Sequence, residues 1–277
     1  MPPMVYCKME NIISPTGAEA EGWLISVGGT PKEMLSRSPE FTYRRLLHAS
    51  RISEKMGAQI IGLGAFTKVV GDAGVTVARR SSLPITTGNS YSASGALWAA
   101  ADAMRRMGLL TINKHNKKVA AKTMVIGASG SIGSVSARLL AMSFDEVYLA
   151  GRTLSKLDEL KASILKETPD AKVFTTIDYN DLLSDMDMIV TSTSGAGKEI
   201  LDIMKVKPGC VITDVARPLD LPAEDVAKRP DVLVIESGEI DLPTKVKGLK
   251  SIGLPPNVIY ASLAETIVLA LEGRFEV

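Results

Sequence analysis

Three glycines in one short segment are the strongest chemical signal in this 277-residue sequence. The segment reads Val-Ile-Gly-Ala-Ser-Gly-Ser-Ile-Gly, and its glycines are Gly127, Gly130 and Gly133. Glycines at such places allow a tight turn, a close approach of the backbone to a pyrophosphate and close packing of a helix on a strand. The segment therefore predicts a dinucleotide site, with a turn in an unrelated α/β fold as the alternative. The residues expected to contact the cofactor here are Gly127, Ser129, Gly130, Ser131, Ile132 and Gly133.

The end of the next expected strand indicates which dinucleotide binds. An NAD site has an Asp or Glu there, about 20 residues after the glycines, to hold the ribose 2′-hydroxyl. This chain has Arg152, Thr153 and Lys156 instead. Because a guanidinium and a hydroxyl suit a 2′-phosphate, we expect NADP rather than NAD. The alternative is that Arg152 and Lys156 are solvated residues at the start of a helix.

Small polar residues follow two later strands of the same region. Thr191, Ser192 and Thr193 end one strand, and Asp214 ends another. Ligands of doubly wound sheets bind beyond the carboxyl ends of the strands, so we expect these residues near the nicotinamide. Loops of this composition are also common without a ligand, and Asp214 could equally cap a turn.

A second polar cluster lies nearer the amino terminus. Lys68 follows a glycine-rich apolar segment, and Asn89 and Tyr91 follow the segment Ile-Thr-Thr-Gly. Lys68 and Tyr91 are candidate proton donors for a reduction. A surface lysine and a helix N-cap at Asn89 are the alternatives.

Hydrophobic periodicity predicts the elements that position these residues. The amino-terminal part reads as a hairpin, a helix that ends at Gly57, a short buried strand and a long helix that ends at Gly108. Its ranges are 5–13, 21–27, 39–56, 59–63 and 89–107. Six strands alternating with helices follow, at 119–126, 146–150, 172–176, 188–191, 211–215 and 232–235, and a last helix covers 260–271.

Alternating strands and helices predict an α/β fold with a doubly wound parallel sheet, because right-handed crossovers place helices on both faces. We expect a smaller α/β substrate or catalytic domain at 1–112 and a Rossmann domain at 119–256. We expect the helix in 257–277 to pack back on the amino-terminal domain.

Composition excludes several other classes. The net charge is +1, so no basic field favours nucleic acid. Two histidines and two cysteines cannot build a His- or Cys-rich metal site, and no metal is expected. We expect a cytoplasmic protein, because no signal peptide, apolar run of membrane-spanning length or disulfide framework is evident. A homodimer is typical of this build.

The sequence resembles the long-chain acyl-[acyl-carrier-protein] reductases and the related predicted amino acid dehydrogenases, whose Rossmann part is of the shikimate dehydrogenase type. The resemblance rests on segments 63–67, 86–89, 127–133, 150–152 and 260–266. It implies the same fold and an NADP-dependent activity. The family's nucleophilic cysteine corresponds to Ser262 here, and serine needs an adjacent base to attack a thioester. Glu265, one helical turn on, is a weak candidate for that base.

Three functions follow from these observations. The first is an NADP-dependent oxidoreductase acting on a carbonyl, hydroxyl or amine of a small or acyl-derived substrate. The second is an acyl-thioester reductase that forms aldehydes, and the third is a dinucleotide-binding protein without catalysis. The candidate catalytic residues are Lys68, Asn89, Tyr91 and Ser262.

Overall fold

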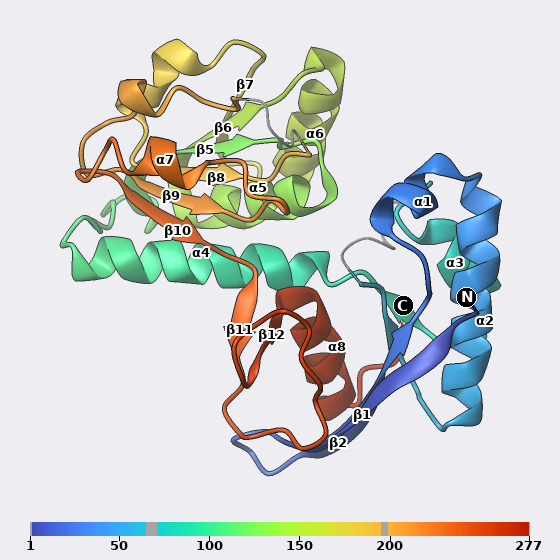
Figure 1. Ribbon diagram of the computed structural model, residues 1–277. Helices are drawn as coiled ribbons and strands as arrows, with labels where there is room; N and C mark the ends of the chain where they lie inside the picture. Colours follow the sequence, from blue (N-terminus) through green and yellow to red (C-terminus); the bar gives the residue numbers. More distant parts are fainter. Residues whose placement is uncertain (1, 65–70, 195–198, 277) are drawn as a thin grey trace. The chain divides into compact units, whose positions relative to one another are not determined.

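The computed structural model describes residues 2–64, 71–194 and 199–276, and its largest sheet has six parallel strands (Figure 1). These are β5 (Val119–Ile126), β6 (Phe144–Ala150), β7 (Lys172–Thr176), β8 (Met188–Thr191), β9 (Val211–Asp214) and β10 (Leu233–Glu236). Their order across the sheet is β10-β9-β8-β5-β6-β7. From the central neighbours β5 and β8, later strands of the chain are added outward at both edges, as in doubly wound dinucleotide-binding sheets. The predicted fold class is confirmed.

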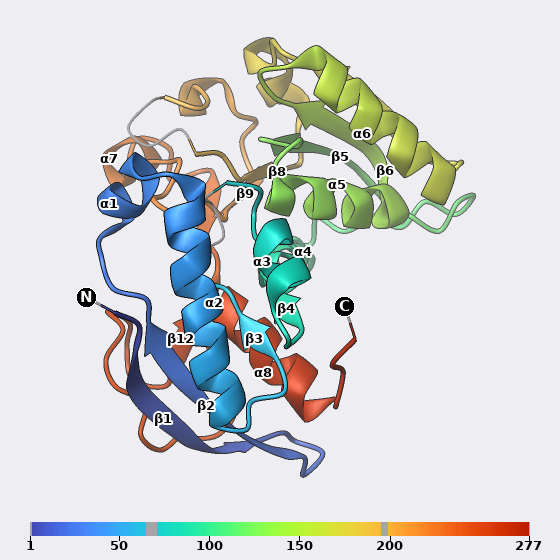
Figure 2. The ribbon, with the colours of Figure 1, turned by 90° about the vertical axis from the view of Figure 1, so that its right-hand side faces the viewer.

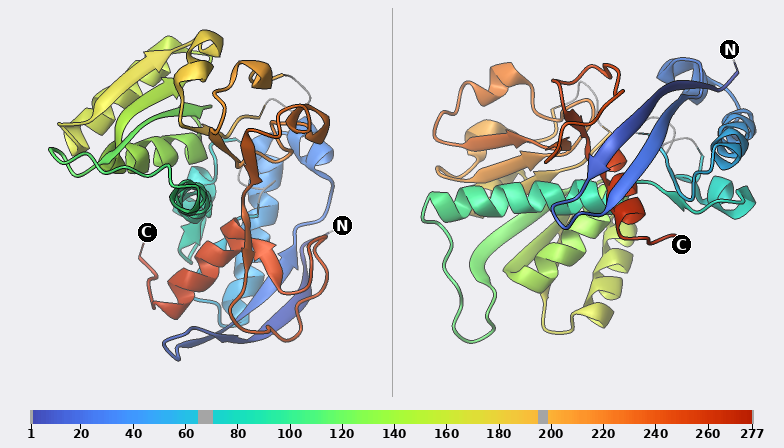
Figure 3. Two further views of the ribbon diagram at one scale, coloured as in Figure 1. Left: turned by 90° about the vertical axis from the view of Figure 1, so that its left-hand side faces the viewer. Right: turned by 90° about the horizontal axis from the view of Figure 1, so that it is seen from below.

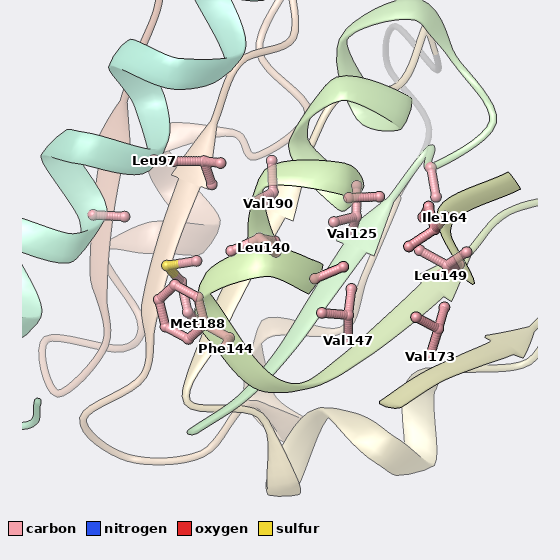
Figure 4. Close-up of a cluster of buried hydrophobic side chains, with 14 of the residues drawn as sticks. Leu97, Val125, Leu140, Phe144, Val147, Leu149, Ile164, Val173, Met188 and Val190 are labelled. Carbon is pink, nitrogen blue, oxygen red and sulfur yellow. The ribbon is translucent and has the colours of Figure 1, made fainter. Parts of the chain in front are cut away.

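Helices cover both faces of this sheet, within a unit formed by residues 92–238 that we call unit 2. Successive strand residues point to opposite faces, so Val125 faces one cluster of buried side chains and Met124 faces another. Figure 4 shows the first cluster, where Val125, Leu140 and Leu97 come from the sheet and two helices. The helices on this face are α4 (Asn89–Arg106), α5 (Ser131–Ser143) and α6 (Leu154–Glu167). The other face packs on η1 (Asn180–Asp185), η2 (Ile203–Lys205) and the region of α7 (Ala223–Val226).

Residues 1–91 and 239–277 form unit 1, which contains three two-stranded sheets (Figure 2). The strands are β1 (Met4–Ile13), β2 (Glu19–Ser26), β3 (Ile61–Gly62), β4 (Ile85–Thr86), β11 (Glu239–Asp241) and β12 (Val258–Tyr260). The β1–β2 and β11–β12 pairs are antiparallel, and β3–β4 is parallel. The helices are α1 (Pro31–Ser36), α2 (Pro39–Lys55), α3 (Val75–Arg80) and α8 (Ala261–Leu271).

Local chemistry explains where two of these elements turn or end. The β1–β2 ribbon (Figure 3) turns at Gly17, which has a φ of +88°, and Ser14 Oγ accepts the Ala18 N–H at 3.0 Å. Helix α2 has Pro39 in its first turn and is followed by Gly57, with a φ of +89°. The turn agrees with the predicted hairpin, and the end of α2 agrees with the predicted helix that stops at Gly57.

The structure divides the chain differently from the predicted domains 1–112, 119–256 and 257–277. Its units change at residues 91/92 and 238/239. Helix α4 buries Ala96, Leu97 and Ala100 in the first core cluster of unit 2, so most of the helix belongs with the parallel sheet. The chain returns to unit 1 at β11, which pairs with β12, and α8 packs against β2 and β3.

One strand prediction was wrong in its bounds, and several short elements were not predicted. The strand expected at 59–63 is only Ile61–Gly62 and is half-buried. The stretch left unassigned before residue 87 contains α3 and β4, and β11 and β12 were not predicted. His48 lies exposed on α2.

Candidate functional site

The glycine loop lies between β5 and α5, where its sequence pattern placed it. Gly127 has a φ of +85°, which makes the tight turn after β5. A β-carbon on Gly133 would lie 2.3 Å from the Gly127 carbonyl oxygen, so only glycine lets α5 approach the loop this closely. Gly130 is the N-cap of α5, and none of the side chains in residues 2–64, 71–194 and 199–276 caps the helix. The first-turn N–H groups of α5 therefore suit a phosphate.

The remaining loop residues differ in exposure. Ser129, Gly130 and Ser131 are exposed, whereas Ile132 is half-buried against the first core cluster of unit 2. A pyrophosphate could approach the exposed backbone between residues 129 and 131, while Ile132 anchors the helix to the sheet.

The end of β6 carries no acidic side chain. It continues into Gly151, Arg152 and Thr153, and α6 starts at Leu154. Arg152, Thr153 and Lys156 are exposed. Within residues 2–64, 71–194 and 199–276 their side chains make no hydrogen bond or ion pair. An exposed guanidinium and ammonium that no carboxylate neutralises fit a 2′-phosphate, so the residues present fit NADP.

The loop after β8 lies against the glycine loop. Ser192 N–H donates to the Ile126 carbonyl at 3.1 Å, and a β-carbon on Gly127 would stand 2.9 Å from the Ser192 carbonyl oxygen. Thr193 donates its N–H and its hydroxyl to Asp220, at 2.8 and 2.5 Å. Thr191 is fully buried at the end of β8. The structure therefore brings Gly127, Ser192 and Thr193 together, as expected from the sheet order.

Asp214 has a different environment from the one its position at the end of β9 suggested. It is 1% exposed, and its carboxylate accepts the backbone N–H groups of Ala216, Asp220 and Leu221 at 2.8 to 3.1 Å. Burial raises the pKa of this carboxyl, and the hydrogen bonds from Leu221 and Ala216 act in the opposite direction. Asp214 thus organises the loop after β9, and a direct contact with the cofactor stays a prediction.

A second cluster forms in unit 1 between α8 and the loop before α4. Ser262 lies in the first turn of α8 and is 5% exposed, and a β-carbon on Gly88 would stand 2.2 Å from its Cα. Glu265, one turn on, accepts hydrogen bonds from the Thr86 hydroxyl, the Gly88 N–H at 3.2 Å and the Tyr91 N–H at 2.7 Å. The Glu265 carboxylate on α8 therefore caps the start of α4, although the two elements are more than 170 residues apart in the sequence.

Three of the four predicted catalytic residues, Asn89, Tyr91 and Ser262, lie in or near this cluster. Helix α4 begins at Asn89, which is half-buried, and the Tyr91 side chain packs against the core cluster of Met9 and Ile12. In the part of the chain that the structure describes, the Ser262 hydroxyl has no hydrogen bond to a base. Lys68 lies outside the described residues.

A cavity of about 700 Å³ opens beside the Glu265 cluster, within unit 1. Its walls come from β2, α2, β3 and α8, and its lining is mainly apolar, with Trp23, Leu24, Leu46, Met56, Leu263 and Ile267. Thr266, next to Glu265, and Gly62 also line it, and a β-carbon on Gly62 would stand 1.9 Å from the Thr266 hydroxyl oxygen. The size and lining suit the apolar part of a small molecule.

Sequence reasoning missed Asp220 and the capping role of Glu265. Asp220 had no motif around it, and Glu265 was considered only as a base. The local signal for both was weak, because each carboxylate binds loops distant in sequence.

None of the helices in the described part of the chain has the length and apolarity to cross a bilayer, and no three His, Cys, Asp or Glu side chains of that part are arranged to hold a metal ion.

Comparisons with known proteins agree with the glycine loop. Residues 123–196 match the family model described as the Saccharopine dehydrogenase NADP binding domain. One solved structure that aligns with part of the chain is shikimate 5-dehydrogenase from Listeria monocytogenes, determined with shikimate and NAD. It is 15% identical, with a TM-score of 0.38 over 52% of this chain and 51% of that chain.

Two relatives match almost the whole chain. Aminotransferase PigE of a Serratia species is 32% identical over 273 residues, which are 98% of this chain and 31% of PigE. The chain therefore spans less than a third of that protein. The long-chain acyl-[acyl-carrier-protein] reductase of Synechococcus elongatus is 24% identical over 285 residues, covering 98% of this chain and 79% of the reductase. The predicted resemblance to these reductases is confirmed, and the chain carries an NADP-binding domain of the Rossmann type.

Proposed function

We propose that this chain is an NADP-dependent oxidoreductase that acts on a carbonyl, hydroxyl or amine of a small or acyl-derived substrate. The observation that carries the proposal is the glycine loop before α5, followed by Arg152 after β6 in place of an acid; among the described residues no side chain caps that helix or pairs with Arg152. The similarity to the Synechococcus reductase along 98% of the chain supports the same class of activity.

Each group of residues has a separate task in this proposal. The first-turn N–H groups of α5 bind the pyrophosphate, and Arg152 binds the 2′-phosphate. When bound, the cofactor supplies or accepts a hydride at its nicotinamide ring. Lys68 or Tyr91 exchanges the accompanying proton with the substrate oxygen or nitrogen, and Asn89 orients that group.

The apolar cavity supports an acyl-derived substrate. Its walls offer few charged groups, so it favours a hydrocarbon tail over a polar metabolite. The cavity also supports a second candidate function, reduction of an acyl thioester to an aldehyde and a thiol by one hydride and one proton. We propose no acyl-enzyme intermediate in that reaction, because Glu265 is engaged by three donors and no described residue acts as a base for the Ser262 hydroxyl.

Single-turnover oxidation of NADPH distinguishes these functions. The purified chain is mixed with stoichiometric NADPH and with an acyl thioester, a simple ketone or an oxo acid plus ammonia, and absorbance at the NADPH band is followed. Decay with the ketone or the oxo acid supports the first function, and decay with release of thiol supports the second. NADPH binding without decay for any substrate class would favour a non-catalytic dinucleotide-binding protein.

A matched pair of variants tests the cavity. Ala49 lines the cavity, whereas the adjacent His48 is exposed on the same helix. We expect Ala49→Phe to raise KM about tenfold for substrates with long tails and to leave the Kd of NADPH unchanged, since a phenyl ring fills space needed by several methylenes. His48→Phe should change neither value. Equal KM values in the two variants would show that the cavity does not bind the tail of the substrate.

A further inference from the structure

Asp220 holds the loop that follows β8, and we infer that it is a positioning residue for the nicotinamide half of the cofactor. Its two carboxylate oxygens accept separate donors of Thr193, the N–H at 2.8 Å and the hydroxyl at 2.5 Å. Asp220 is 5% exposed, so water does not compete for these hydrogen bonds. Two bonds from one residue fix both the position and the rotation of the Thr193 backbone.

Asp220 is itself held in place from β9. Its N–H donates to Asp214 Oδ2 at 2.8 Å, and the Leu221 N–H donates to the same oxygen at 3.0 Å. Asp214 pairs in register with Thr191 at the ends of β9 and β8. A closed chain of contacts therefore runs from the end of β9 through Asp214 and Asp220 to Thr193, and returns to the end of β8.

Thr193 transmits this arrangement to the glycine loop. A β-carbon on Gly127 would stand 3.2 Å from Thr193 Cγ2, so the two loops touch with no room for a further atom. In a doubly wound sheet a dinucleotide crosses the switch point, here between β5 and β8. Its adenosine half lies over the β5–β7 side, and its nicotinamide half lies over β8 and β9. The inference rests on the proposed function, because the position of Thr193 matters to catalysis only if a dinucleotide binds there.

The test compares two ligands on one variant. Thr193→Val keeps the size of the side chain and removes the hydroxyl that donates to Asp220. We expect this variant to raise the Kd of NADPH about tenfold, because binding must then order a loop that Asp220 no longer holds through the hydroxyl. The Kd of adenosine 2′,5′-bisphosphate, which lacks the nicotinamide half, should not change. Isothermal titration calorimetry measures both constants.

Two conservative variants serve as controls. Thr193→Ser keeps the hydroxyl and should retain the wild-type affinity for NADPH. Asp220→Asn should also retain most of it, because the amide oxygen can accept the Thr193 N–H while the amide nitrogen donates to the hydroxyl. Arg152→Ala should instead weaken both ligands, because NADPH and the bisphosphate both carry the 2′-phosphate.

The possible results separate the inference from the function on which it rests. An unchanged Kd of NADPH in Thr193→Val would overturn the positioning role. An equal loss for both ligands would also overturn it, since that result indicates a general disturbance of the domain. If the wild type binds neither ligand, the proposed function fails and the inference fails with it.

Discussion

A β-carbon on Gly88 would stand 2.2 Å from the Cα of Ser262, so the loop before α4 is in direct contact with the first turn of α8. Gly88 also has a φ of +71°, which disfavours other residues. We expect Gly88→Ala to lower the free energy of unfolding by more than about 2 kcal/mol, from backbone strain and overpacking together. Urea denaturation measures this loss.

Gly17→Ala is the control for that experiment. Gly17 has a φ of +88°, but a β-carbon there would meet no atom within 4 Å. Gly17→Ala should lower the free energy of unfolding only by the cost of backbone strain, about 1 kcal/mol. Equal losses in the two variants would show that the close approach of Gly88 to Ser262 costs nothing.

Arg152 should decide the preference between the two nicotinamide cofactors. We expect the wild type to bind NADPH more tightly than NADH, and Arg152→Ala to weaken NADPH by about tenfold or more while NADH is unaffected. Calorimetric titration of both cofactors measures this. Equal affinities in the wild type would contradict the assignment of the 2′-phosphate to Arg152.

Two glycines of the same loop should respond differently to substitution. A β-carbon on Gly133 would meet the Gly127 carbonyl oxygen at 2.3 Å, so Gly133→Ala should destabilise the domain by about 2 kcal/mol or more. At Gly130 the same distance is 3.2 Å and φ is −76°. Gly130→Val should therefore fold and yet bind neither cofactor, because its side chain takes the place of the pyrophosphate. Thermal melting with NADPH titration distinguishes the two cases, and a stable Gly130→Val protein with normal affinity would argue against the loop as the cofactor site.

Ser262 should form no acyl intermediate. Serine needs a base to become a nucleophile, and Glu265 is already bound to Thr86, Gly88 and Tyr91. We expect intact-protein mass spectrometry after incubation with acyl-CoA to show no adduct on the wild type or on Ser262→Ala. An adduct on Ser262→Cys alone would reveal a reductase scaffold without its nucleophile, whereas a wild-type adduct that Ser262→Ala abolishes would refute the prediction.

Cys210 should be unreactive in the native protein. It is fully buried in unit 2, and burial raises the pKa of its thiol to about 12. In a Cys7→Ser background it is the only thiol, and a chromogenic disulfide reagent should label it only after denaturation. The pKa of this thiol in the unfolded chain is about 8.5, so between there and about pH 12 the unfolded state loses the proton while the folded state keeps it. The free energy of unfolding therefore falls progressively as the pH rises through this range. Rapid labelling of the native protein, or an identical alkaline stability profile for Cys210→Ala, would contradict this account.

The amino-acid sequence alone determined the cofactor-binding half of this protein. Local signals were sufficient there, because the tight turn at Gly127, the close approach at Gly133 and the alternation of strands and helices are short-range requirements of the backbone. For the same reason the place of Arg152 directly after β6 could be predicted, and most strands of the parallel sheet were found within one or two residues.

Only the tertiary structure decided how unit 1 is assembled and what its polar residues do. Its strands β3, β4, β11 and β12 have two or three residues each, too few for a periodic pattern, and are held by partners distant in the chain. Glu265 was considered as a base beside Ser262 and is found to cap α4, and Asp214, predicted to lie near the nicotinamide, also holds the loop that carries Asp220. A carboxylate takes its role from the donors that folding brings to it, and a sequence does not contain those distances.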